Sequence, residues 1–267
     1  MEKKGKFVRM SLVEFTGWLN ANRFDRQIGV IQNHHTYIPA YAHFKGNNHI
    51  ALCESMERSH LERGFAEIAQ NLTIFPDGDV VLCRSFNTIP AGIKGANRNG
   101  LCIENLGNFN LGGDVMSEAQ RKAIVAVNAR LLMRFGLPCD TDHVVYHHWW
   151  DLNSGQRTNG SGNTKSCPGT AFFGGNSVAA AQADFLPLIA AAMGAAANPP
   201  APPQALFQGE VNTPSLRIRD TPGVDGTQLG AVANGALLAI YEVRNGWYRI
   251  HPTAQRWVSG RYVAKRE

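Results

Sequence analysis

Residues 28–36 read IGVIQNHHT, and residues 143–150 read HVVYHHWW. Each stretch is a short apolar run that ends on a pair of histidines. A run of this length, bounded by turn residues, is typical of a buried strand. We therefore predict two buried strands, each of which carries two imidazoles to its end.

Further elements are expected on both sides of these strands. Ser11 followed by Glu14 forms a capping-box pattern, which marks the start of a helix. Other helices are expected over residues 48–63, from Ser117 to a stop at Gly136, and over about 177–192. Strands are expected over residues 72–82, around a Pro-Asp-Gly turn, and over residues 100–107. This alternation predicts an α/β domain with a mixed central sheet flanked by helices.

A Pro/Ala-rich segment divides the chain. Residues 194–208 read GAAANPPAPPQALFQ, and proline-rich segments of this kind act as extended spacers. We predict a first domain over residues 1–193, a linker over 194–208 and a second domain over 209–267.

The second domain is expected to be a small all-β barrel. Its sequence consists of short alternating runs separated by Gly, Pro and Asn turns. Eight Lys/Arg residues against five Asp/Glu give it a charge of +3, out of +5 for the whole chain. Its aromatic residues are expected mostly in the barrel core: Tyr241, Trp247, Tyr248, Trp257 and Tyr262.

Composition excludes several classes of protein. With 44% apolar and 18% charged residues, the bulk of the chain is not disordered. The longest weakly polar run, residues 185–197, is shorter than the about 20 residues that span a bilayer, so we expect no membrane insertion. The basic N-terminal stretch is interrupted by polar residues, which predicts no secretory signal peptide. The positive net charge favours an anionic partner, but no zinc-finger spacing or basic-aromatic run indicates nucleic acid.

Candidate metal ligands occur at three places in the sequence. His34 and His35 end one predicted strand, His147 and His148 end the other, and Cys167 lies in the loop sequence KSCPG. Zinc binds imidazole nitrogen and thiolate sulfur, and a catalytic zinc has three protein ligands and one open position. Histidine pairs that bind no metal are the alternative.

Five blocks of sequence together indicate a family. They are VIQNHHTYIP (30–39), AQNLTIFPDG (69–78), GLCIENLGNF (100–109), VVYHHWWD (144–151) and NTKSCPG (163–169). In this order they resemble the zinc-dependent N-acetylmuramoyl-L-alanine amidases of the type-2 amidase and peptidoglycan-recognition-protein superfamily, over about residues 25–190. The second domain resembles a bacterial SH3-like domain, through RIRDTPG (217–223) and NGWYR (245–249).

The resemblance implies a zinc (Zn²⁺) site. In this family the matching positions, His34, His147 and Cys167, are the metal ligands. His148 replaces His147 if the strand register differs by one residue. His35 is expected to face the opposite side of its strand.

The resemblance also implies catalytic groups. Lys165, two residues before the cysteine, is expected to stabilise an oxyanion. Glu104 is expected to act as the general base, because relatives carry a glutamate in the matching strand. Gln70 takes the position at which some relatives have a tyrosine, and an amide cannot accept the proton. His43, His49, His60 and His143 are expected to have no role in the site.

The expected activity is hydrolysis of the amide between N-acetylmuramic acid and L-alanine in bacterial peptidoglycan. A wall-binding tail and the missing signal peptide favour a monomeric phage endolysin that stays in the host cytoplasm until release. A bacterial autolysin or an exported effector amidase is the alternative. A non-catalytic peptidoglycan-binding protein is another, although Cys167 argues against it.

Overall fold

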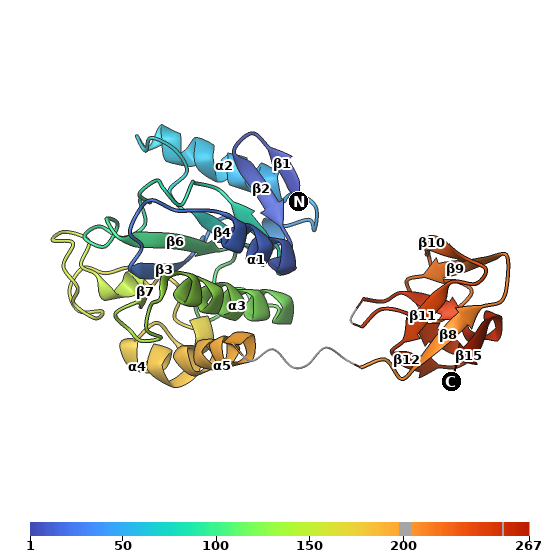
Figure 1. Cartoon of the computed structure of the whole chain (residues 1–267). Coiled ribbons are helices and arrows are strands. Elements are labelled where there is room, and N and C mark those ends of the chain that lie inside the picture. The colour runs from blue at the N-terminus through green and yellow to red at the C-terminus, as the bar shows by residue number, and fades with distance from the viewer. Residues whose placement is uncertain (198–203, 253, 267) are drawn as a thin grey trace. The chain divides into compact units, whose positions relative to one another are not determined.

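The computed structural model describes residues 1–197, 204–252 and 254–266. The chain divides into two compact units, Met1–Ala197 and Asn198–Glu267, which are described separately (Figure 1). Within the expected linker, residues 194–197 are still helical and residues 207–208 already belong to a strand. Residues 198–203 of the linker lie outside the described residues.

The first unit contains a mixed sheet, as the sequence predicts, and the sheet has seven strands. The strand order is β1-β2-β5-β4-β6-β3-β7. β3 pairs in parallel with both β6 and β7, β4 pairs in parallel with β6, and the remaining pairs are antiparallel. The strands are β1 (Glu2–Lys4), β2 (Phe7–Met10), β3 (Val30–His35), β4 (Leu72–Ile74), β5 (Val80–Leu82), β6 (Gly100–Asn105) and β7 (Val144–Tyr146). The hairpin β1–β2 was not predicted.

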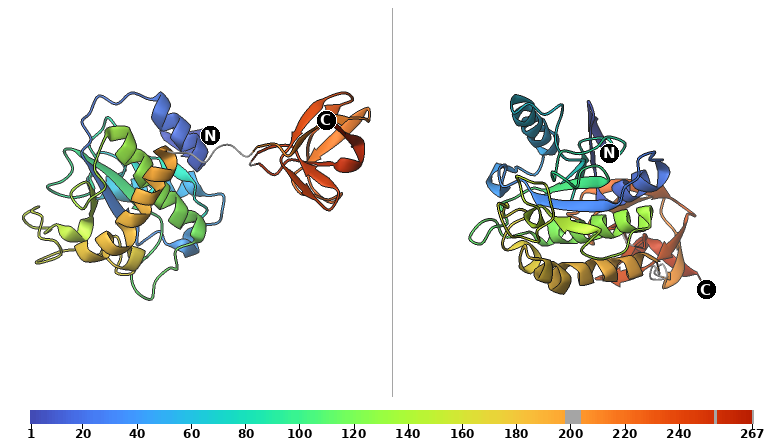
Figure 2. Two further views of the ribbon diagram at one scale, coloured as in Figure 1. Left: turned by 60° about the horizontal axis from the view of Figure 1, so that its bottom comes forward. Right: turned by 90° about the vertical axis from the view of Figure 1, so that its left-hand side faces the viewer.

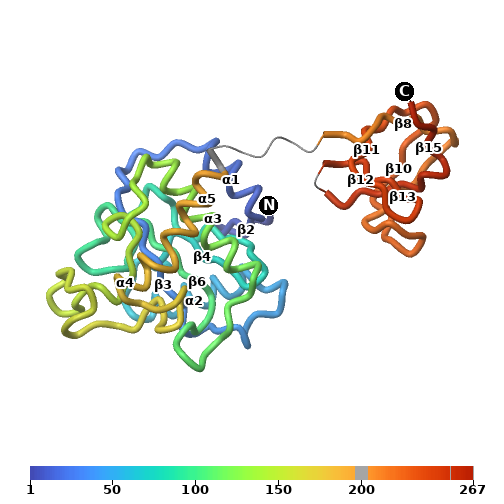
Figure 3. Tube along the Cα trace, turned by 90° about the horizontal axis from the view of Figure 1, so that it is seen from below, coloured from blue at the N-terminus to red at the C-terminus, as the bar shows by residue number. Residues whose placement is uncertain are grey.

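Helices cover both faces of the sheet. α2 lies on one face and α3 on the other, and α5 packs against the outer side of α3 (Figures 2 and 3). The helices are α1 (Leu12–Ala21), α2 (His49–Glu62), α3 (Glu118–Phe135), α4 (Val178–Ala180) and α5 (Leu186–Ala197), with a π-helical turn, η4 (Ala181–Phe185), between the last two. Short 3-10 turns are η1 (Tyr41–His43), η2 (His147–Trp149) and η3 (Phe172–Gly174).

The predicted helix ends are confirmed at α1 and α3. Ser11 and Glu14 form the reciprocal capping box at the start of α1, and the Ser117 side chain accepts a hydrogen bond from the backbone amide of Gln120. Gly136 ends α3 with φ of 64°, a left-handed conformation that glycine adopts without steric cost.

Side chains on the two faces of the sheet form two hydrophobic cores. The core beneath α3 includes Ile31, Leu101 and Ile103, and the core beneath α2 includes Cys53 and Cys83. All five cysteines are free, and Cys139 is only half-buried. Trp149 and Trp150 belong to the core beneath α3.

One helical run departs from the sequence expectation. Because α4, η4 and α5 follow one another without a break, residues Val178–Ala195 are long and apolar enough to cross a membrane by length and composition. This is weak evidence for a span, since a helix that packs against a protein core passes the same test. Ala181, Phe185 and Ile189 are buried in the core beneath α3.

The second unit is all β, as predicted. A five-stranded sheet, β10-β9-β14-β13-β12, and a three-stranded sheet, β11-β8-β15, enclose one core, to which Val211, Leu216 and Val258 contribute. The elements are β8 (Phe207–Val211), β9 (Ser215–Arg219), β10 (Gln228–Ala233), β11 (Leu237–Ile240), β12 (Glu242–Arg244), β13 (Trp247–Arg249), β14 (Trp257–Ser259), η5 (Gly260–Tyr262) and β15 (Val263–Arg266).

A buried amide pair joins the sheet to α3. Asn33 Nδ2 donates to Asn128 Oδ1 at 2.8 Å, and Asn128 Nδ2 donates to Asn33 Oδ1 at 3.1 Å. Neither residue is exposed. Since each amide satisfies the other, the pair fixes α3 against the strand that carries the first two histidines.

We predict that Asn128→Ala lowers the free energy of unfolding by about 2 kcal/mol or more, because it leaves the Asn33 amide buried without its partner. Lys122→Ala, on an exposed part of the same helix, is the matched control and is expected to change it by less than about 0.5 kcal/mol. Urea unfolding followed by circular dichroism at 222 nm measures both. Equal effects of the two substitutions would contradict a stabilising role for the pair.

Candidate metal centre and substrate groove

The candidate site lies where the parallel strands β3, β6 and β7 end. The register pairs His34 with Glu104, and Asn33 with Tyr146. The next residue after Tyr146 is His147, which therefore comes beside His34. Their ring centroids are 4.9 Å apart. Residues far apart in the sequence meet here because parallel strands place their carboxyl ends at one edge of the sheet.

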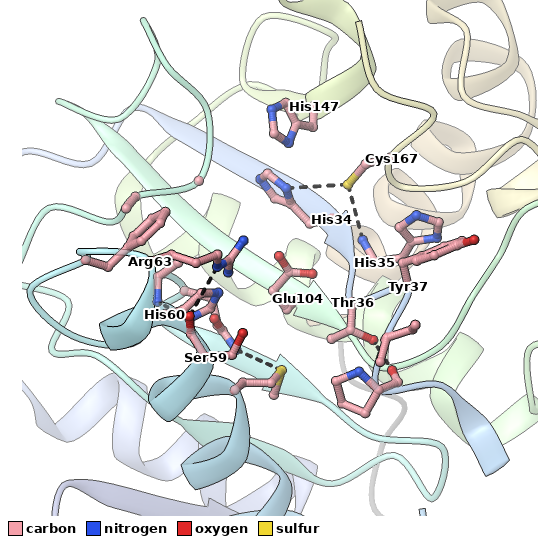
Figure 4. Close-up of a pocket in the computed structure, with 18 of the residues that line it drawn as sticks. His34, His35, Thr36, Tyr37, Ser59, His60, Arg63, Glu104, His147 and Cys167 are labelled. Atoms are coloured by element: carbon pink, nitrogen blue, oxygen red, sulfur yellow. Dashed lines mark hydrogen bonds between the residues drawn. The ribbon is translucent and has the colours of Figure 1, made fainter. Parts of the chain in front are cut away.

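The two histidines of β3 have different surroundings. His34 turns toward the groove, beside His147 and Cys167 (Figure 4). The His35 ring accepts a hydrogen bond at Nδ1 from the backbone amide of Phe109, at 3.1 Å. The alternation of side chains along a strand explains the difference.

Cys167 reaches these histidines from the loop after β7. Its Sγ lies 3.5 Å from His34 Nδ1 and accepts a hydrogen bond from the His35 backbone amide at 3.4 Å. One donor atom each of His34, His147 and Cys167 all lie within 4.8 Å of one another, and all three residues are buried. The structure thus brings together the three residues that the sequence pointed to as ligands.

His148 lies outside this cluster and fastens the loop. Its backbone amide donates to the Cys167 carbonyl oxygen at 2.8 Å, and its Nδ1 donates to the Lys165 carbonyl oxygen at 2.7 Å. The strand β7 ends at Tyr146, and both histidines fall in the turn η2. The sequence alone left the choice between His147 and His148 open because it does not show where β7 ends.

The donor set fits a zinc ion. Burial lowers the pKa of His34 well below its usual value and lowers the pKa of His147 to about 4, so both imidazoles are neutral near pH 7. Neutral imidazoles have a lone pair to offer. Burial, together with Glu104, raises the pKa of the Cys167 thiol, but a bound cation favours the thiolate. Two nitrogens and one sulfur are a donor set that zinc prefers.

Glu104 lies beside the histidine cluster. A carboxylate oxygen of Glu104 and a ring nitrogen of His34 form a group with Cys102 Sγ in which all atoms lie within 4.8 Å. Burial raises the pKa of Glu104 to about 8, while the charges of Lys165 and Arg63 oppose the shift. A carboxyl group with a pKa near neutrality is suited to accept and return a proton.

Gln70 lies in the same groove but is engaged elsewhere. It is fully buried, and its Nε2 donates to Thr73 Oγ1 at 3.0 Å. Lys165 is exposed on the groove, and its ammonium group forms no ion pair with the described residues. The structure therefore places a free cation and a shielded carboxyl group on the groove near the cluster.

The groove has a volume of about 790 Å³, and one wall is a face of α2 with the residue after it. The wall residues are Leu52, Ser55, Met56, Ser59, His60 and Arg63. The sequence alone did not predict that this face of α2 lines the groove. The spacing of three and four residues was the pattern that could have revealed it.

Two histidines expected to have no role also line the groove, namely His43 and His60. His60 accepts a hydrogen bond at Nδ1 from the Ala69 backbone amide at 3.1 Å. Burial lowers its pKa to about 4, so the neutral ring carries its proton on Nε2. The Arg63 guanidinium stacks on Phe65 and donates from Nε to the Ser59 carbonyl oxygen at 3.2 Å. The wall therefore presents hydrogen-bond donors.

Comparisons with solved structures give matches of low identity. N-acetylmuramoyl-L-alanine amidase LysC from Clostridium intestinale is 19% identical with a TM-score of 0.42, over 56% of this chain and 82% of that one. Drosophila PGRP-LB is 20% identical with a TM-score of 0.45, over 61% and 84%. The endolysin amidase LysCS from Clostridium intestinale is 20% identical with a TM-score of 0.42, over 55% and 78%. None of the curated proteins matches the sequence.

Two family models match the chain. The model of the N-acetylmuramoyl-L-alanine amidase family matches residues 24–170, and that of the bacterial SH3 domain matches residues 214–264. The first match contains every residue of the candidate site. Since it also spans more than half of the sequence, the chain belongs to the N-acetylmuramoyl-L-alanine amidase family and carries a bacterial SH3 domain after its amidase unit.

Proposed function

We propose that the protein is a zinc-dependent hydrolase of bacterial peptidoglycan that cleaves the amide between N-acetylmuramic acid and L-alanine. The observation that carries the proposal is the buried cluster of His34, His147 and Cys167 beside Glu104, on a groove within the amidase match. A binding protein without catalysis needs the groove but neither the ligand cluster nor the shielded carboxyl group.

His34, His147 and Cys167 are proposed to hold the zinc ion. When bound, zinc supplies a Lewis acid that polarises a carbonyl group and makes water more acidic. The neutral imidazoles need lose no proton to bind it, whereas the Cys167 thiol must lose one. His148 supports this site indirectly, since it fixes the loop that carries Cys167.

Glu104 is proposed to move the protons. As general base it takes a proton from the attacking water, and as general acid it returns a proton to the leaving amine of L-alanine. Lys165 is proposed to stabilise the negative charge that develops on the carbonyl oxygen, because its exposed side chain lies on the groove. The amide bond then breaks, and the lactyl carboxylate and the free amine are the products.

The wall formed by α2 is proposed to bind the stem peptide. Arg63 and the Nε2–H group of His60 present positive charge and a donor to the groove, and stem peptides carry carboxylates. The SH3 domain is proposed to tether the enzyme to the wall, which raises its effective concentration at the substrate.

The biological setting in the proposal is a monomeric phage endolysin that remains in the host cytoplasm until release. The combination of an amidase unit with an SH3 domain supports a wall-directed lytic role. A bacterial autolysin or exported effector amidase is the alternative, which cellular fractionation of an infected host distinguishes.

Mass spectrometry of digested peptidoglycan tests the cleavage. We expect free peptides that begin with an unblocked L-alanine and glycan strands whose lactyl groups end in a carboxylate. New reducing sugar ends would identify a glycosidase instead. Intact peptidoglycan after prolonged incubation with the zinc-loaded protein would support the non-catalytic alternative.

Metal analysis of variants tests the ligand set. Purified protein is expected to contain about one zinc per chain. The His147→Ala variant is expected to lose most of its zinc, because one of the three ligands is gone. The matched variant His148→Ala, which changes the neighbouring residue, keeps all three ligands and is expected to keep its zinc. Elemental analysis after dialysis measures both. Zinc loss in the His148 variant alone would contradict the assignment.

Substitution of Glu104 tests the proton carrier. Glu104→Gln keeps the size of the side chain and removes its basicity, so turnover is expected to fall by about 100-fold or more. Zinc content is expected to stay near the wild-type value. Gln70→Ala is the matched comparison in the same groove, and it is expected to have a smaller effect on turnover. A larger loss at Gln70 would reverse the assignment.

A further inference from the structure

The five-stranded sheet of the SH3 domain has an outer face, which points away from the hydrophobic core of the domain. Side chains alternate along its strands, and Leu216, Ile218 and Val258 face the core. Arg217, Arg219 and Trp257 alternate with these residues, so they lie on the opposite face.

The strand register arranges this outer face in two rows. Cross-strand partners share a face, so Arg219, Trp257, Arg249 and Glu242 form one row. Ser259, Trp247 and Arg244 form the second row. Arg217 lies two residues before Arg219 on β9 and therefore on the same face as Arg219. The outer face thus carries four arginines, two tryptophans and one carboxylate.

Trp257 lies beneath one of the arginines of this face. Its side chain is fully buried, as expected, although it does not belong to the cluster that contains Val211, Leu216 and Val258. The Arg244 guanidinium stacks over its ring, with Cζ 5.3 Å from the centroid. The indole therefore supports the Arg244 side chain.

Few of these charges are neutralised. Glu242 is shared, since it accepts hydrogen bonds from Arg244 and from Arg249 at 3.0 Å. Arg219 donates to the Gly226 carbonyl oxygen, which carries no net charge. The Arg217 side chain is exposed and forms no hydrogen bond or ion pair with the described residues. The face has an excess of positive charge, and Arg217 has its donors available.

We propose that this outer face binds an anionic phosphodiester polymer of the bacterial wall. Planar guanidinium groups bind phosphate oxygens with two parallel hydrogen bonds, and neighbouring strands of this sheet carry several of them. A polymer with a negative charge in every repeat complements such a row, whereas the uncharged backbone of a glycan does not. The proposal rests on the wall-tethering role of the SH3 domain and names its ligand.

Binding of the full chain to poly(glycerol phosphate) tests the proposal, measured by calorimetry over a range of salt concentrations. Arg217→Gln is expected to weaken binding about tenfold and to reduce the salt slope by about one contact. Arg217→Lys keeps the charge without the planar fork and is expected to lie between. Lys265→Gln, a matched loss of one charge on the three-stranded sheet, is expected to bind like the wild type.

Sedimentation with two wall preparations identifies the source of the polymer. Walls stripped of phosphodiester polymers with hydrofluoric acid are expected to capture less protein than untreated walls, and Arg217→Gln is expected to abolish most of this difference. Equal capture by both preparations would overturn the proposal. So would an equal loss in Arg217→Gln and Lys265→Gln, or tighter binding to duplex DNA than to poly(glycerol phosphate).

The test of polymer binding and the test of amidase activity can fail independently of each other. Failure of the mass-spectrometric test with polymer binding intact would overturn the proposed function and leave the polymer site in place. Normal cleavage of peptidoglycan together with no affinity for poly(glycerol phosphate) would overturn the polymer site alone.

Discussion

The parallel pairing of β3 with β6 and β7 is the constraint on which the candidate site depends. In its register His34 lies opposite Glu104, and His147 follows the residue opposite Asn33. A slip of one residue would turn His34 to the other face of the sheet. The buried pair of Asn33 and Asn128 opposes such a slip, because only one register lets both amides find their partners on α3.

The loop after β7 depends on the same edge of the sheet. Cys167 accepts a hydrogen bond from the backbone at the end of β3. His148 holds the loop by donating hydrogen bonds to two carbonyl oxygens of the loop. The loop in turn helps to bury the histidines. That burial keeps the imidazoles neutral and raises the pKa of Glu104 to about 8, so the same packing sets the protonation of the proposed ligands and of the proposed proton carrier.

Much of this arrangement could be predicted from the sequence because its determinants are local. Capping residues, turns and apolar periods are enough to locate α1, α2, α3 and the inner strands. The choice between His147 and His148 is different, since it depends on where β7 stops and η2 begins. The groove wall on α2 was missed because Ser59, His60 and Arg63 form a polar helix face, which ordinarily faces solvent.

The candidate site also concentrates polar atoms that the fold leaves without partners. Within the described residues, Gln32 Oε1, His34 Nε2, Gln70 Oε1 and Glu104 Oε2 are all buried without a hydrogen bond. The chain at Gly92 packs closely against two of these atoms, because a Cβ there would lie 2.3 Å from Gln32 Oε1 and 3.1 Å from His34 Nε2. Each such atom costs on the order of 1–3 kcal/mol. The apolar core beneath α3 lies on the opposite face of the same strands, so it can offset this cost without filling the groove. One face of the sheet thereby stabilises the fold, and the other face carries the candidate site. A substitution that removed one of the unpaired polar atoms would be expected to stabilise the fold at the expense of the site.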